Sequence, residues 1–164
     1  MLNKEYLPML DKLKEHFQEN GQISLQEFLT PEGKEQLKIN IQEHQDVLMS
    51  HKYSVLKPTT LFSDELIQSF LVELTGAKPE GEWEGLQFEK GDFLLRKPLQ
   101  EGIMAVYVLK KESEVCFAGP EDTALLPPTD NTLTLIYVDE ETEFFVTHLT
   151  HRLEKKLILF QKII

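Results

Sequence analysis

The spacing of apolar residues changes halfway along this 164-residue chain, and that change constrains the fold most strongly. Before residue 80, apolar side chains recur every three or four residues, as they do on the buried stripe of an amphipathic helix. From residue 81 they gather into about eight strand-sized runs, spaced by roughly ten residues and separated by turn residues. Helices first and strands afterwards predict an α+β domain in which helices pack outside an antiparallel sandwich or barrel.

Each helix expected in the first part has a capping residue or a terminal glycine as its signal. The first expected helix covers 6–17 and stops near Gly21. The second begins at Thr30–Pro31 and carries Leu37, Ile41 and Leu48. The third starts at Ser63-Asp64-Glu65 and ends at Gly76. Between the first two, the stretch from Ile23 to Leu29 is expected to form an edge strand.

The strands expected in the second part cover 83–88, 93–95, 103–109, 115–117, 124–126, 133–138, 144–149 and 157–164. The run from Ile103 to Leu109 is almost continuously apolar, which is typical of a strand buried on both faces. We expect one domain over residues 1–164, mainly helical over 1–80 and β-rich over 81–164.

Charge and composition exclude several classes of function. The net charge of −11 repels phosphates, so direct nucleic-acid binding is not expected. No apolar run approaches the roughly 20 residues of a membrane span, and residues 1–6 lack the layout of a signal peptide. Cys116 is the only cysteine, which excludes an internal disulfide framework and favours a reducing, cytoplasmic setting.

The sequence shows few groups arranged for catalysis. It contains neither a Gly-x-Ser-x-Gly nucleophile elbow nor a phosphate-binding glycine loop, and Cys116 lies between apolar neighbours as an inert thiol does. His148 and His151 are three residues apart in an expected strand, so their side chains would point to opposite faces. On the residues alone, the chain is an α+β domain without a demonstrable active site.

Two segments carry a family pattern. One joins Leu74-Thr75-Gly76 to Gly91-Asp92-Phe93-Leu94-Leu95, and the other leads from Pro127-Pro128-Thr129-Asp130-Asn131 to Phe144-Phe145-Val146 and His151-Arg152. Together with residues 3–29, they resemble the second domain of the ribosomal-protein prolyl hydroxylases, which are two-domain oxygenases dependent on 2-oxoglutarate and iron(II).

The resemblance implies a double-stranded β-helix, a cupin-like jelly roll of two facing sheets with the N-terminal helices packed outside. In that family the first domain hydroxylates, holding iron through His-x-Asp and a distant histidine and anchoring 2-oxoglutarate with a basic residue. The second domain is a jelly roll without activity that is implicated in engaging partners.

The same resemblance places the His-x-Asp motif after Gly91-Asp92-Phe93, where this chain has Arg96-Lys97-Pro98. Iron(II) sites of this kind need two imidazoles and one carboxylate. His148 or His151 would stand at the distal position, but the other two ligands are missing. We therefore expect neither iron(II) nor 2-oxoglutarate, and we assign no catalytic or metal-binding residues.

The leading hypothesis is a catalytically inactive, oxygenase-like module that binds or regulates a protein. The acidic surface favours a basic partner, and the resemblance links the module to prolyl hydroxylation of ribosomal proteins or to translation. The alternative is an active dioxygenase with atypical ligands, drawn from His148, His151 and Asp92 with Arg152 or Lys155 for the co-substrate. A cupin-like barrel that binds a small molecule is the third hypothesis.

Overall fold

The computed structural model describes residues 1–43, 48–49, 53–59, 62, 64–79, 82–89, 91–109, 115–118, 123–126, 129–146 and 157–164. Its helices are η1 (Lys4–Met9), α1 (Leu10–Asn20), α2 (Pro31–Glu43) and α3 (Glu65–Thr75). Its strands are β1 (Gln22–Leu25), β2 (Leu48–Met49), β3 (Ser54–Thr59), β4 (Trp83–Phe88), β5 (Leu94–Pro98), β6 (Gly102–Leu109), β7 (Val115–Ala118), β8 (Thr123–Leu126), β9 (Thr132–Val138), β10 (Glu143–Val146) and β11 (Leu157–Ile163).

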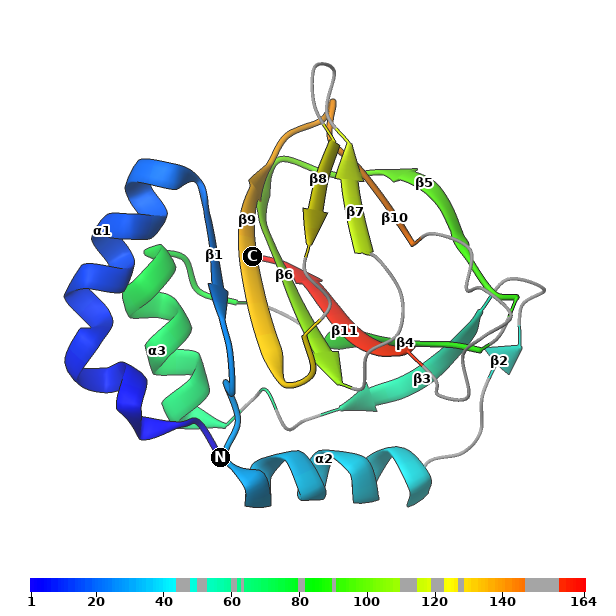
Figure 1. Ribbon diagram of the computed structural model, residues 1–164, viewed down its shortest axis with the longest axis horizontal. Coiled ribbons are helices and arrows are strands. Elements are labelled where there is room, and N and C mark those ends of the chain that lie inside the picture. The colour runs from blue at the N-terminus through cyan, green and yellow to red at the C-terminus, as the bar shows by residue number, and fades with distance from the viewer. Residues whose placement is uncertain are drawn as a thin grey trace.

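The strands form two sheets that make up a jelly roll (Figure 1). The larger sheet has the order β1-β9-β6-β11-β4-β3-β2, and the smaller has the order β5-β10-β7-β8. From β4 onward the chain passes repeatedly from one sheet to the other, and the pairings between these strands are antiparallel. The predicted α+β double-stranded β-helix with N-terminal helices outside is confirmed.

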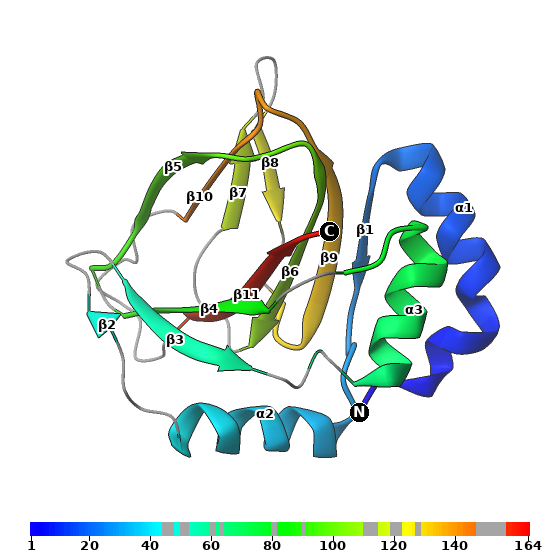
Figure 2. The same ribbon diagram turned by 180° about the vertical axis from the view of Figure 1, so that it is seen from behind.

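Helices α1 and α3 have the capping residues that the sequence predicts. Gly21 and Gly76 follow α1 and α3 with φ of +70° and +75°, a conformation that glycine adopts without steric cost. Asp64 caps α3 by accepting hydrogen bonds from the amides of Leu66 (3.1 Å) and Ile67 (3.3 Å). Seen from behind in Figure 2, α1 and α3 lie side by side beyond β1, while α2 runs alongside β3.

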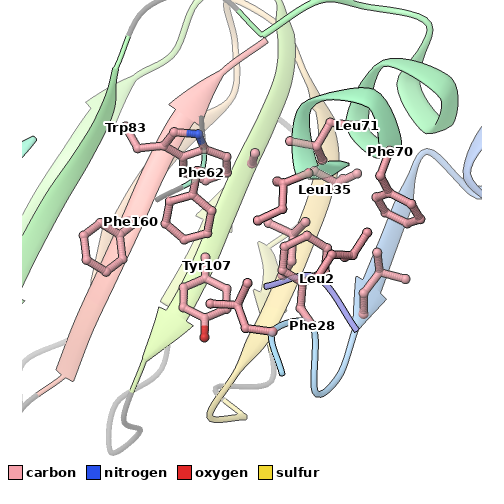
Figure 3. Close-up of a cluster of buried hydrophobic side chains, with 14 of the residues drawn as sticks. Leu2, Phe28, Phe62, Phe70, Leu71, Trp83, Tyr107, Leu135 and Phe160 are labelled. Atoms are coloured by element: carbon pink, nitrogen blue, oxygen red, sulfur yellow. The ribbon is translucent and has the colours of Figure 1, made fainter. Parts of the chain in front are cut away.

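A large apolar cluster lies between the larger sheet and the helices (Figure 3). Alternate residues of β6 and β11, among them Tyr107 and Phe160, project into it. The rings of Phe62 and Trp83 stack there with centroids 4.4 Å apart. Burial of these aromatic side chains anchors the helical part to the barrel, because each removes a large apolar area from water.

Asn131 ties the N-terminal part to the barrel. It precedes β9 with a left-handed φ of +56° and is 9% exposed. Its Oδ1 accepts hydrogen bonds from the Leu29 amide (3.0 Å) and the Tyr107 hydroxyl (2.8 Å), and its Nδ2 donates to the Leu29 carbonyl (2.9 Å). Asn131, which lies in the segment that carries the family pattern, is therefore a structural clamp.

Two expectations about the first part of the chain need correction. Leu48 does not continue the second helix, because α2 is bounded by Glu43 and Leu48 pairs with Val55 as part of β2. The strand β3 was not expected in a part read as mainly helical. The expected edge strand is present as β1 at one edge of the larger sheet, although it is shorter, since Glu27 turns the chain with a φ of +51°.

The described helices are short. The longest, α2, has 13 residues, and none of the described helices is both long and apolar enough to cross a membrane.

Candidate functional site

The interior of the barrel is filled by apolar side chains, which we call the interior cluster. Along β6 they alternate with residues of the large cluster between the larger sheet and the helices: Met104, Val106 and Val108 face inward. The members of the interior cluster are Leu86, Phe88, Leu94, Met104, Val106, Val108, Val138, Phe144, Val146 and Leu159. An interior packed in this way gives polar chemistry room only at the ends of the barrel.

One of those ends carries Arg96-Lys97-Pro98, the segment that the resemblance places where an iron-binding motif would lie. The antiparallel pairings bring together the starts of β4, β6 and β10 with the ends of β5, β9 and β11. A hydrogen bond from the Leu99 amide to the Thr142 carbonyl (3.0 Å) joins the turns on either side. We call this the Lys97 end of the barrel.

The segment Arg96-Lys97-Pro98 lies at this end. Lys97 pairs with Phe144 and Leu94 pairs with Val146, so the register shifts and two residues of β5 oppose Phe145. The Arg96 guanidinium lies 5.2 Å from the centre of the Phe145 ring and 3.2 Å from a Glu143 carboxylate oxygen. The cross-strand partner of Lys97 is Phe144, whose ring is fully buried.

A polar pair interrupts the apolar lining nearby. Gln161 of β11 pairs with Glu84 of β4, and its Nε2 donates to Glu84 Oε2 over 2.7 Å. Gln161 alternates with Leu159 and Ile163, which belong to or pack against the interior cluster, so its side chain faces the barrel interior. Gln161 is 7% exposed, and its buried Oε1 has no hydrogen-bond partner among the described residues.

Exposed carboxylates lie at this end of the strands and in the adjoining turns. They belong to Glu82, Glu84, Glu101, Asp139, Glu140 and Glu141. In the turn between β9 and β10, the Thr142 hydroxyl donates to Asp139 Oδ1 over 2.7 Å, and this bond lowers the pKa of Asp139. The Lys97 end therefore carries an excess of negative charge at neutral pH.

Asp92 lies at the opposite end of β5, in the turn between β4 and β5. Its carboxylate accepts a hydrogen bond from the Glu89 amide (2.8 Å), and its own amide donates to the Glu89 carbonyl (2.9 Å). His148, His151, Arg152 and Lys155 lie outside the described residues. The structure therefore neither brings these four to Asp92 nor separates them from it.

The described residues at the Lys97 end do not fit an iron(II) site. Across the described ranges, no three histidine, cysteine, aspartate or glutamate side chains are grouped so that they could hold a metal ion. At this end, Arg96 and Lys97 would add cationic repulsion, and Phe144 offers no donor atom.

A second feature is a groove between the helices. Its volume is about 570 Å³, and it lies between η1, α1 and α3. Its walls include Leu7, Leu10, Leu66 and Phe70, of which Leu7 is 37% exposed. Its lining also includes Gln68, Glu73 and Lys78, and pockets of this size are typical of binding sites.

Sequence reasoning missed the Glu84–Gln161 pair. The two residues are 77 positions apart, so no local spacing connects them. A signal was present nonetheless, because Gln161 interrupts an apolar run at a position that alternates with Leu159 and Ile163.

No protein-family model and no curated protein matches the sequence. Solved structures do match. A 2OG-Fe(II) oxygenase family oxidoreductase from Burkholderia pseudomallei has a TM-score of 0.71 at 12% identity, covering 93% of this chain and 89% of its own. A prolyl-4-hydroxylase from Pseudomonas putida gives 0.69 at 12% identity, covering 95% and 99%.

A third similar structure is a prolyl hydroxylase from Trichoplax adhaerens, in complex with a hypoxia inducible factor oxygen degradation domain peptide fragment. Its TM-score is 0.69 at 10% identity, covering 98% of this chain and 91% of its own. At such identities the likeness shows the fold alone. The chain has the double-stranded β-helix fold of 2OG-Fe(II) oxygenases, and a shared fold does not carry activity with it.

Proposed function

We propose that this chain is a catalytically inactive, oxygenase-like jelly-roll domain that acts as a protein-binding or regulatory module. The observation that carries the proposal is the composition of the Lys97 end. Where the resemblance calls for iron ligands, β5 presents Arg96 and Lys97, and the facing position on β10 holds the buried ring of Phe144. The described residues offer no facial set of two imidazoles and a carboxylate, so among them oxygen activation by iron(II) has no support.

The partner in this proposal is a basic protein in the cytoplasm. Exposed carboxylates at the Lys97 end and the net charge of −11 favour association with cationic surfaces. The resemblance in sequence to the second domain of ribosomal-protein prolyl hydroxylases supports a ribosomal protein, or a catalytic oxygenase subunit acting on one.

Two measurements on the untagged full chain test the proposal. Incubation with iron(II), ascorbate and 2-oxoglutarate in air, followed by NMR, should yield no succinate above the controls without iron and without protein. Binding to a basic ribosomal protein should be measurable at low salt and weaken at moderate salt, since charge attraction is screened. Iron-dependent succinate formation would instead establish the active dioxygenase with atypical ligands, and a lack of salt-sensitive binding would contradict the choice of partner.

A further inference from the structure

The Glu84–Gln161 pair contains a buried hydrogen-bond acceptor, Gln161 Oε1, that has no donor among the described residues. Exchanging the amide oxygen and nitrogen of Gln161 would place an oxygen without a proton 2.7 Å from the Glu84 carboxylate. The orientation in the structure is therefore the favourable one, and it leaves Gln161 Oε1 without a donor among the described residues. A buried carbonyl oxygen left in this state costs about 1–3 kcal/mol, so a donor that reaches it is favoured.

The chemistry of the pair selects a cationic donor. Glu84 is exposed and contributes a carboxylate, and Gln161 contributes a neutral acceptor directly beside it. A guanidinium presents several charged N–H groups in one plane and can serve both acceptors together, whereas a hydroxyl has one O–H and a neutral amide lacks the charge that attracts a carboxylate. The aliphatic part of an arginine side chain also suits the adjoining apolar residues Met104 and Ile163.

The charges around the pair also favour a cationic donor. Glu82 and Glu101 are exposed at this end, together with the turn from Asp139 to Glu141. The cations of this end are Arg96, the exposed Lys97, and Lys162, which is buried and follows Gln161 in β11. Glu143 and the Phe145 ring engage Arg96. The exposed carboxylates outnumber these cations. The field at Glu84 is therefore negative, and it draws a basic segment toward the pair.

We propose that the Glu84–Gln161 pair at the Lys97 end of the barrel is where a basic protein partner inserts an arginine side chain. This inference rests on the proposed protein-binding function and names its binding site. On insertion, the guanidinium donates to the Glu84 carboxylate and to Gln161 Oε1.

The test uses the full chain and two short peptides, one of alternating arginine and glycine and one with citrulline in place of arginine. Citrulline keeps the shape of the side chain and removes its charge. The arginine peptide should bind, the citrulline peptide should not, and the Gln161 side-chain amide resonances should shift on binding. Glu84→Gln and Gln161→Leu should each weaken binding at least about fivefold. Glu15→Gln, the same charge change on the exposed face of α1, should change affinity less than about twofold.

Thermal unfolding confirms that each variant is folded before binding is compared. Equal weakening by Glu84→Gln and Glu15→Gln would show general charge attraction and overturn the site, while the protein-binding function would stand. A basic ribosomal protein that binds while the arginine peptide does not would also overturn the site alone. Failure of both to bind would overturn the site and the choice of a basic partner together.

Discussion

Replacing Asn131 by alanine should destabilise the protein by about 3–5 kcal/mol. The substitution removes three buried hydrogen bonds, two to Leu29 and one to the Tyr107 hydroxyl. Each lost hydrogen bond costs about 0.5–1.5 kcal/mol net, and alanine adds about 1 kcal/mol because φ at this position is +56°. A loss of that size is a large fraction of the roughly 5–15 kcal/mol that stabilises a domain.

Two companion variants separate the contributions. Asn131→Gly loses the same hydrogen bonds without the backbone strain, so it should be about 1 kcal/mol less destabilised than Asn131→Ala. Tyr107→Phe removes one hydrogen bond and should cost about 1 kcal/mol. Urea unfolding followed by fluorescence measures all three, because Trp83 is the only tryptophan and is 1% exposed in the folded chain. A cost below about 1 kcal/mol for Asn131→Ala would refute the clamp, and equal costs for the alanine and glycine variants would refute the strain.

Further expectations concern the barrel. Phe144→Ala should cost about 3–5 kcal/mol by the same assay, since the ring is fully buried in the interior cluster, and a small loss would show that the Lys97 end is not packed. Gly85→Ala should cost about 1–3 kcal/mol, because a Cβ there would lie 2.9 Å from the Phe160 ring; an unchanged unfolding midpoint would contradict this close approach. Thr142→Val should raise the pKa of Asp139 in a carboxyl ¹³C NMR titration, since the hydroxyl that lowers it is lost; an unchanged pKa would contradict that cause. The lowered pKa makes this carboxylate stabilising above the pKa of the unfolded chain, and that contribution is lost as pH falls through the folded-state pKa.

Much of the fold could be predicted because its signals are local. Asp64, Gly21 and Gly76 mark helix ends through their own hydrogen bonds or backbone angles, which no distant residue has to supply. The apolar run from Ile103 to Leu109 predicts a strand covered on both faces, and it lies between the two clusters as expected.

The parts that were missed depend on distant partners. Leu48 continues the helical spacing set by Leu37 and Ile41, but pairing with Val55 places it in a strand. The strand β3 contains Lys57 and Pro58 and shows no alternation, so only its neighbours reveal it. At the candidate site, Arg96-Lys97-Pro98 was identified from the resemblance, whereas the role of Phe144 opposite Lys97 appears only when β5 and β10 are paired.

The iron(II) content of the untagged chain, loaded anaerobically and then freed of loosely bound metal by gel filtration, tests the central claim most directly. The account predicts far less than one iron per chain, because the Lys97 end offers a packed phenyl ring and cationic side chains in place of a ligand set. One tightly held iron per chain would contradict it.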